Sequence, residues 1–238
     1  MESKVKLSHI LNVAAIIIGA AMLSVALFSS VKYFKSFDRM ISVKGLAEKE
    51  VIANRVIWPL SFKEIGNDLE SLYGSIKTKN KIIKDYLISK GLEEGEISLS
   101  SPQIIDMNAE RYRNEPSTYR YNITSVLTVS SEKVELVRNL ISSQSDLLQK
   151  GVALSSGDYQ FDIQYLYTKL NDIKPEMIEE ATKNARASAE KFAKDSESKL
   201  GKIKNASQGQ FSINDRDANS PHIKIVRVVS TVEYLLRD

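Results

Sequence analysis

The sequence predicts an α+β fold, in which mainly antiparallel sheet structure carries packed helices in the order ββαββαβαββ. Two patterns indicate it: segments with an apolar residue at every second position alternate with segments whose apolar residues recur every three or four positions. The strand segments also occur in adjacent pairs, which suits hairpins and therefore antiparallel pairing. Apolar residues make up 42% of the 238, enough for a real core, and no long linker divides residues 41–238. We expect one α+β domain there, preceded by one N-terminal transmembrane helix, and the patterns leave open whether the strands form one sheet or two.

The strands are assigned from alternation. They are expected at residues 41–49, 51–65, 97–107, 119–129, 159–168, 202–213 and 223–236. Gly45 is a candidate bulge in the first strand, and Pro59 indicates an edge or a bulge in the second, because proline cannot donate to the ladder. The last strand has apolar residues on both faces, which predicts a strand covered on both sides.

The helices are assigned from apolar stripes and from their end signals. They are expected at residues 67–90, 132–149 and 175–201. Asn67 can cap the first helix, with Glu70 three residues on, and Gly91 can end it. The second helix stops at Gly151, and the third opens near Pro175, because proline suits a first helical turn.

The N-terminus contains an apolar stretch at residues 10–28, which at about 1.5 Å per residue just crosses a hydrocarbon core of roughly 30 Å. We interpret it as an uncleaved transmembrane anchor that follows a short cytoplasmic tail, residues 1–9, and precedes a juxtamembrane segment, residues 29–40. A cleaved signal peptide, and hence a secreted form, is the alternative, with Ser24 and Ala26 at the small-residue positions. That cut would fall inside the apolar run. Both flanks are basic, so charge does not set the orientation.

Composition excludes several kinds of function. The net charge of only +3 argues against nucleic acid as the main partner, because phosphate binding needs clustered Lys and Arg. The chain has no cysteine, which excludes disulfides, cysteine nucleophiles and Cys-type zinc sites. The two histidines, His9 and His222, lie far apart in the sequence. We expect no cofactor and no catalytic constellation.

An ordered set of segments supports a family resemblance. These segments are residues 41–48, 119–121, 180–193, 200–203 and 228–234. Together they resemble the SIMPL-domain family of bacterial envelope proteins, which includes periplasmic immunogenic and oxidative-stress-defence proteins. The resemblance covers roughly residues 41–236, and residues 171–178 and 208–217 look like a membrane-anchored subgroup. It implies a domain that faces the periplasm from the inner membrane, a tendency to form homo-oligomers, and no established catalytic residues.

The polar segment 214–220 is the most suggestive candidate for a metal site. Asp215, Asp217 and Asn219 occupy positions one, three and five of a calcium-loop pattern. The pattern then fails, because Ser220 stands where glycine is needed and the twelfth position is not Glu. A hairpin tip rich in turn-forming residues is the simpler interpretation.

Four alanines of the third helix recur at every fourth position and form one ridge of small side chains: Ala181, Ala185, Ala189 and Ala193. Such a ridge allows the close approach of another element. Packing on the chain's own sheet is the simpler interpretation, and a subunit interface is the alternative.

These observations favour a non-enzymatic, membrane-anchored periplasmic protein that self-associates and contributes to envelope integrity or to tolerance of stress, including oxidative stress. The alternative is a binding module for a small ligand, a cation or an envelope protein, which would use the loops at 108–118 and 214–220. An enzyme that uses Asp215 and Asp217 is a third alternative. The identity of other protein partners does not follow from the sequence.

Overall fold

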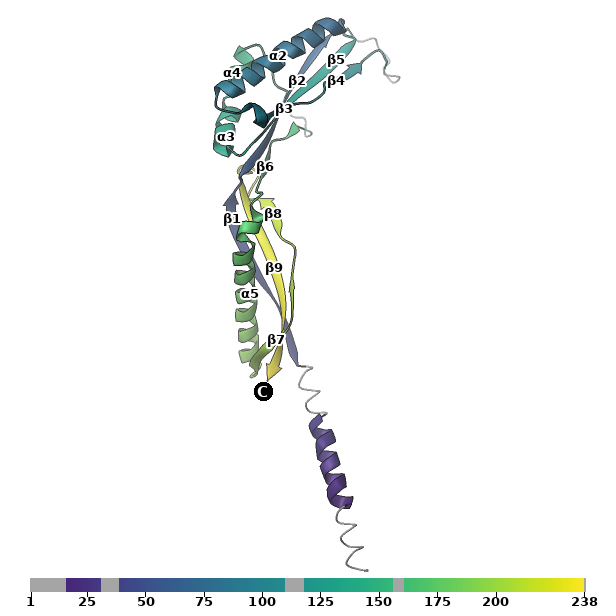
Figure 1. Cartoon of the computed structure of the whole chain (residues 1–238), viewed down its shortest axis with the longest axis vertical. Helices are drawn as coiled ribbons and strands as arrows, with labels where there is room; N and C mark the ends of the chain where they lie inside the picture. Colours follow the sequence, from purple (N-terminus) through teal and green to yellow (C-terminus); the bar gives the residue numbers. More distant parts are fainter. Residues whose placement is uncertain (1–15, 31–38, 110–117, 156–160, 238) are drawn as a thin grey trace, which may run out of the picture. The chain divides into compact units, whose positions relative to one another are not determined.

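The computed structural model describes residues 16–30, 39–109, 118–155 and 161–237 (Figure 1). The fold is α+β with antiparallel strand pairs, as the sequence predicted. The chain divides into two compact units: unit 1 is Met1–Lys49, Ile173–Ser212 and Arg227–Asp238, and unit 2 is Glu50–Asp172 and Ile213–Val226. Strands at residues 40–52 and 223–237 contribute to both units, so no linker composition marks the division in the sequence.

The strands form two sheets. Their bounds are β1 Met40–Ile52, β2 Arg55–Gly66, β3 Ile97–Leu99, β4 Gln103–Asp106, β5 Tyr121–Ser131, β6 Gln164–Leu166, β7 Lys199–Gln208, β8 Ser212–Asp215 and β9 Ile223–Arg237. The helices are α2 Leu69–Ser89, α3 Val134–Ser142, α4 Ser145–Gln149 and α5 Leu170–Asp195, with a 3-10 turn, η1, at Glu94–Glu96. One sheet has the order β1-β9-β7 with β8 beside β9, and the other has the order β3-β5-β2-β6 with β4 beside β5.

Unit 2 is built on the long pairing of β2 with β5, which runs without interruption from Val56 opposite Ser131 to Gly66 opposite Tyr121. Helices α2, α3 and α4 lie on this sheet (Figure 1). The core between these layers is aliphatic and aromatic, and its largest fully buried side chains include Phe62, Leu60, Ile83, Leu87, Leu127 and Leu147. From Val56 to Phe62 every second residue of β2 enters this core, as the alternation predicted.

Unit 1 is a thinner structure, in which α5 lies along the sheet of β1, β9 and β7 (Figure 1). Residues of β1 alternate strictly: Val43, Gly45 and Ala47 are buried and their neighbours are exposed. The apolar cluster is small and consists of Val43, Ala185, Ala189, Val232 and Tyr234, with Ile41 and Leu200 partly buried beside it.

Several expected elements are interrupted. The strand expected at 97–107 is two short strands, and Pro102 lies between them, where its missing N–H cannot join a ladder. The helix expected at 132–149 breaks after Ser142, and a short second helix, α4, follows, in which Leu147 is buried and Leu148 is exposed. The strand expected at 159–168 is ordered as β6 only at Gln164–Leu166, and its residues 159 and 160 lie outside the described residues.

Other boundaries also differ from the expectation. The strand expected at 202–213 is two strands, β7 and β8. Helix α5 starts at Leu170, so Pro175 lies inside the helix and removes one backbone hydrogen bond there, and the helix ends at Asp195, not Gly201. The N-cap of α2 is Asp68, whose carboxylate accepts from the Ser71 N–H at 2.6 Å, and not Asn67. In β9 the burial is one-sided, because even-numbered residues are buried from Lys224 to Tyr234 and odd-numbered ones are partly exposed.

Pro59 lies in an interior strand of its sheet, but the neighbouring β6 pairs only with Arg55–Ile57 of β2. At Pro59 that side of β2 therefore has no strand partner among the described residues, which is consistent with the edge position that proline requires.

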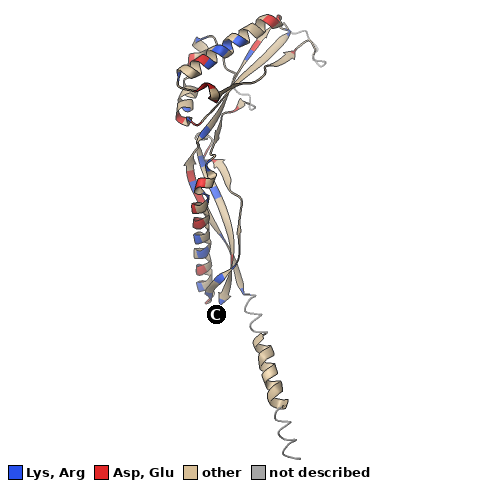
Figure 2. Cartoon of the chain, viewed as in Figure 1, with Lys and Arg blue, Asp and Glu red and all other residues tan. Residues whose placement is uncertain are grey.

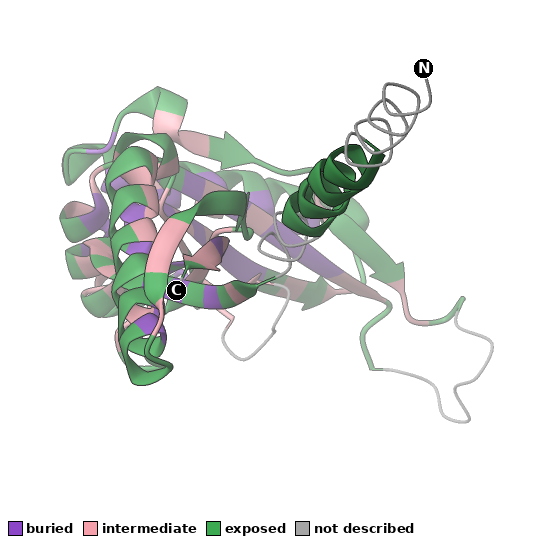
Figure 3. Ribbon diagram, turned by 90° about the horizontal axis from the view of Figure 1, so that it is seen from below, coloured by how far each residue is buried: buried purple, intermediate pink, exposed green. Residues whose placement is uncertain are grey.

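Residues 16–30 form a helix whose residues are all exposed (Figure 3) and which carries no charged side chain (Figure 2). Within the described part of the chain, no helix has both the length and the apolar character needed to cross a membrane. The first six residues of the anchor expected at 10–28 lie outside the described residues.

Candidate functional site

The acidic residues of the segment 214–220 are engaged by neighbouring cations and by the backbone. Asp215 forms an ion pair with the ammonium of Lys224, whose side chain is nearly buried. Asp217 accepts from Arg216 Nε at 3.0 Å and from the Asn219 N–H at 2.9 Å, and the hydrogen bond from Arg216 lowers the pKa of Asp217. The bond to Asn219 N is the local bond of an Asx turn, which accounts for these residues as turn formers. Over the described ranges, no group of three or more His, Cys, Asp or Glu side chains is arranged to hold a metal ion.

Residues 110–117 of the second candidate loop lie outside the described residues, but both ends of the loop are fixed. Arg120 donates to Asp106 through Nε at 3.1 Å and Nη2 at 3.0 Å, and this hydrogen bonding lowers the pKa of Asp106. Asn67 accepts from the Arg120 N–H at 2.8 Å and donates to the Thr118 carbonyl at 3.3 Å. Asn67, which was predicted to cap α2, therefore holds the C-terminal end of this loop instead.

The alanine ridge of α5 packs within unit 1. Ala181, Ala185, Ala189 and Ala193 are all between 0% and 2% exposed. A Cβ at Gly45 would lie 1.9 Å from the Ala181 carbonyl oxygen and 2.4 Å from the Ala185 nitrogen, so the helix backbone almost touches β1. Gly45 is needed for this approach and not, as expected, for a bulge. The ridge leaves no accessible surface for a partner subunit.

The surfaces of unit 1 that do remain accessible belong to its sheet. In unit 1, α5 is the one described helix that covers the sheet, and the residues of β1 that alternate with the buried ones are exposed, Leu46 among them. Strands β1 and β7 lie at the two edges in the order β1-β9-β7, and β7 is exposed over nearly all of its length. Backbone groups at such edges are available for pairing with another chain.

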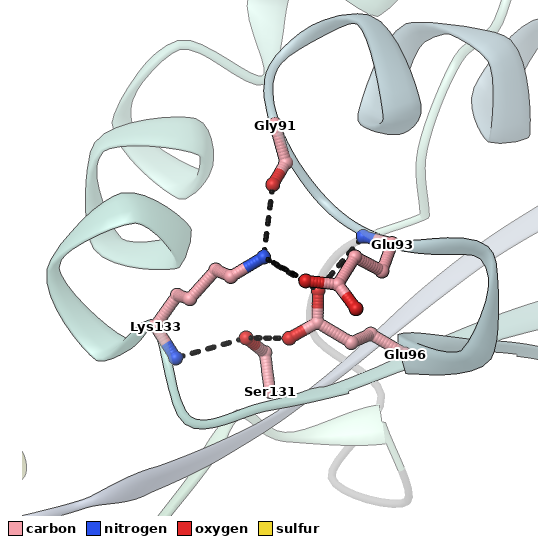
Figure 4. Close-up of polar contacts among 5 residues, drawn as sticks. All are labelled: Gly91, Glu93, Glu96, Ser131 and Lys133. Atoms are coloured by element: carbon pink, nitrogen blue, oxygen red, sulfur yellow. Dashed lines mark hydrogen bonds and ion pairs between the residues drawn. The ribbon is translucent and has the colours of Figure 1, made fainter.

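A polar cluster joins the C-terminal end of α2, η1 and the end of β5 in unit 2 (Figure 4). Lys133 Nζ donates to the Gly91 carbonyl at 3.2 Å, to Glu93 Oε1 at 2.9 Å and to Glu96 Oε2 at 3.4 Å. The Ser131 hydroxyl donates to Glu96 Oε1 at 2.6 Å and accepts from the Lys133 N–H at 2.9 Å. We call these five residues the polar latch, because they hold three chain segments together.

The polar latch contains a serine, a carboxylate and a lysine, but its geometry is that of a structural cluster. Ser131 is 2% exposed and its hydroxyl is already used as donor and acceptor, so no substrate atom can reach it. Burial alone would raise the pKa of Glu96, but hydrogen bonds from the Glu93 backbone, Ser131 and Lys133 lower it overall. Hydrogen bonding to Glu93 raises the pKa of Lys133.

A groove lies in unit 2 between α2 and the strands β3 and β4. It consists of two cavities of about 350 Å³ and 450 Å³, which share Tyr73 and Pro102 in their walls. The other lining residues are Leu69, Glu70, Ile76, Lys77, Asn80, Lys81 and Lys84 from α2, Ile97, Leu99 and Ile104 from β3 and β4, and Ile123 and Leu127 from β5. We call this surface the α2–β4 groove. Its walls are mainly apolar, with one row of lysines.

A family model matches residues 41–230, which is most of the chain, and its description reads "SIMPL: Protein of unknown function (DUF541)". The chain belongs to the SIMPL family. This confirms the resemblance that the ordered segments suggested, while the match does not distinguish a membrane-anchored subgroup of SIMPL proteins. No curated protein is similar enough to the chain to count as a match. The SIMPL description names no activity, so it provides no reaction and no site residue.

Sequence reasoning did not find the polar latch or the α2–β4 groove. The latch depends on contacts between residues about 35 to 40 positions apart, which no local pattern marks. The groove did leave two signals. Asn80 interrupts the apolar stripe of α2, and Lys77, Lys81 and Lys84 recur at helical spacing beside it.

Proposed function

We propose that this SIMPL protein is a non-enzymatic component of the bacterial envelope, in which residues 10–28 tether a self-associating domain to the inner membrane with the domain on the periplasmic side. Its contribution would be to envelope integrity or to stress tolerance, including oxidative stress. The apolar stretch at 10–28 supports the tether. The resemblance of the ordered segments to envelope proteins supports the location.

One observation carries the self-association: α5 covers one face of the sheet of unit 1. Within the described residues, the other face is exposed on β1 and partly exposed on β9, and the edge strand β7 is exposed over nearly all of its length. The apolar cluster beneath α5 is small, and small cores are marginal unless further surface is buried by assembly. A second copy that packs on this face or pairs with an edge would supply that burial.

The absolute mass of the full chain, purified in detergent and measured by light scattering with the detergent mass subtracted, tests this proposal. We expect a discrete oligomer that persists on dilution. Leu46→Asp places a charge on the exposed face of β1 and should lower the mass towards that of a monomer. Leu148→Asp is the matched control, because Leu148 is an exposed leucine of α4 in unit 2.

A monomer at every concentration would refute self-association through unit 1. An oligomer that both substitutions leave intact would move the interface away from the β1 face. An oligomer that both substitutions dissolve would point to a general loss of folding, which circular dichroism of the two variants would reveal.

A further inference from the structure

We propose that the α2–β4 groove binds a fatty acid, with its acyl chain along the apolar walls and its carboxylate at the lysine row of α2. The site lies within unit 2, so it stands apart from the self-association of unit 1.

The walls of the groove are exposed apolar side chains from both sides. Tyr73 of α2 is 61% exposed, Leu99 of β3 is 57% exposed, and Ile104 of β4 is 54% exposed. Ile123 and Leu127 of β5 are buried and form part of the floor. Cavities of about 350 Å³ and 450 Å³ fall within the range of about 300–1,000 Å³ that small-molecule sites occupy. A linear acyl chain suits two cavities that adjoin along one groove.

The first cavity of the groove is lined by lysines and the second by one carboxylate, that of Glu70. Lys77, Lys81 and Lys84 all line the first cavity from α2. Lys81 is paired with Asp85 at 2.6 Å, and Lys84 is paired with Glu94. Lys77 has no carboxylate partner among the described residues, so it is the cation with most to gain from an anionic headgroup.

A buried amide supplies a second polar anchor beside the lysines. Asn80 is only 8% exposed, lines the first cavity, and accepts from the Ser125 hydroxyl at 3.1 Å through its Oδ1. Its Nδ2 donates no hydrogen bond to any described residue, so it can donate to a ligand in the groove. A carboxylate oxygen at this end of the groove would accept from it.

A peptide that adds a strand to the edge formed by β3 and β4 fits this site less well. These strands have only three and four residues, and Pro102 interrupts them. Short, proline-broken edges are the kind that resist strand addition. The apolar walls and the lysine row both remain available to a ligand that needs no backbone pairing.

Photolabelling of the full chain, reconstituted in nanodiscs of zwitterionic lipid, tests the proposal. The probe is dodecanoate with a diazirine at the end of its chain, and labelled residues are located by mass spectrometry. We expect the label on Tyr73, Leu99, Ile104 or their immediate neighbours. The affinity of unlabelled competitors should increase with chain length from octanoate to dodecanoate, by up to about four-fold for each methylene buried.

Substitution of the lysines separates charge recognition from simple partitioning. Lys77→Gln should weaken labelling by about two- to five-fold. Replacement of Lys77, Lys81 and Lys84 together should weaken it by about ten-fold or more. Lys63→Gln is the matched control and should change nothing, because Lys63 is exposed on β2 and does not line the groove. An uncharged probe, a diazirine-bearing dodecanol, should label the original protein and the three variants to the same low extent.

Three outcomes would overturn the proposal. One is labelling spread evenly over the surface, and another is labelling that the lysine substitutions leave unchanged. The third is absence of label in the groove together with chemical cross-links from Lys77 to a second copy of the chain, which would make the groove a subunit interface.

Discussion

Units 1 and 2 both place a long helix on a sheet, but the side chains between the layers differ in size. The buried residues of α5 are Met177 and four alanines. Those of α2 are Leu72, Ile76, Asn80, Ile83, Tyr86 and Leu87. Small side chains let the α5 backbone approach β1 until Gly45 has no space for a Cβ, whereas α2 is held off its sheet by aliphatic and aromatic groups.

This difference implies two ways of stabilising the same arrangement. Unit 2 removes much apolar surface from water, and a buried leucine or isoleucine contributes about 1.5–3 kcal/mol. Alanines bury little area, so unit 1 relies on close contact between backbones and on hydrogen bonds such as that from Asn184 Nδ2 to the Leu46 carbonyl at 2.8 Å. Unit 1 should therefore be sensitive to enlargement, and unit 2 to truncation.

The largest effect is expected from Gly45→Ala. The new Cβ would meet backbone atoms of α5 at 1.9 Å and 2.4 Å, so no side-chain rotation can relieve the clash and α5 must move away from β1. We expect a loss of about 4 kcal/mol or more, enough to unfold unit 1 locally. Hydrogen exchange of the full chain measures this, as a loss of protection in α5 and β1 while α2 stays protected.

The control is the same substitution in the helix of unit 2. Gly74 lies within α2 with nothing within 4 Å of an added Cβ, so Gly74→Ala should stabilise α2 by about 1 kcal/mol. Equal behaviour of the two substitutions would contradict the idea that α5 is held by backbone contact.

Truncation of a buried side chain should cost more stability in unit 2 than in unit 1. Leu87 is fully buried in the core of unit 2, and Leu87→Ala should cost about 3 kcal/mol through lost transfer free energy and a residual cavity. The truncation that unit 1 offers is Ala189→Gly, which should cost only about 1 kcal/mol, mainly from backbone entropy. Chemical denaturation followed by hydrogen exchange in each unit measures both values. A cost for Ala189→Gly as large as that for Leu87→Ala would show that the ridge contributes far more than its area.

The contrast between the units also explains what the sequence could predict. The alanines at every fourth position were visible, and packing on the chain's own sheet was the simpler interpretation, which their burial supports. The need for Gly45 was not visible, because it depends on α5, which is about 140 residues away. A glycine in a strand has the same local signature whether it forms a bulge or admits a helix.

Local sequence patterns predicted the types of the elements but not how distant elements come together. Strand and helix types followed from periodicity, so the α+β class was predictable. The family was suggested separately, by the resemblance of an ordered set of segments. The division into two units was not, because β1 and β9 run through it as continuous strands. The α2–β4 groove arises where Pro102 breaks an expected strand beside α2, and only the three-dimensional pairing of β3 and β4 with β5 shows that these residues face one another.

The smallest effect is expected in the polar latch, where electrostatics adds to the packing of unit 2. Glu96 is mostly buried, with 18% of its side chain exposed, and its pKa in the folded protein lies below the ordinary value of 4.5. A carboxylate with a lowered pKa contributes stability that is fully present above about pH 4.5 and is lost as the pH falls through the folded value. We expect Glu96→Gln to cost about 1 kcal/mol at pH 7, and the difference from the original protein to shrink as the pH falls below 4.5.

Glu94→Gln is the control for the latch, because Glu94 is two residues away and also pairs with a lysine, Lys84, but is largely exposed. Its pKa is lowered by the hydrogen bond from Lys84, yet solvent screens an exposed pair, so no change in the unfolding midpoint should be resolved. Urea denaturation of both variants between pH 3 and pH 8 measures the comparison. A difference for Glu96→Gln that stays constant over this range would mean that the latch acts through shape alone. A difference that disappears at acid pH would establish that the charge of Glu96 contributes to the stability of unit 2. Unit 1 has no charged side chain among its described buried residues, so it offers no such contribution.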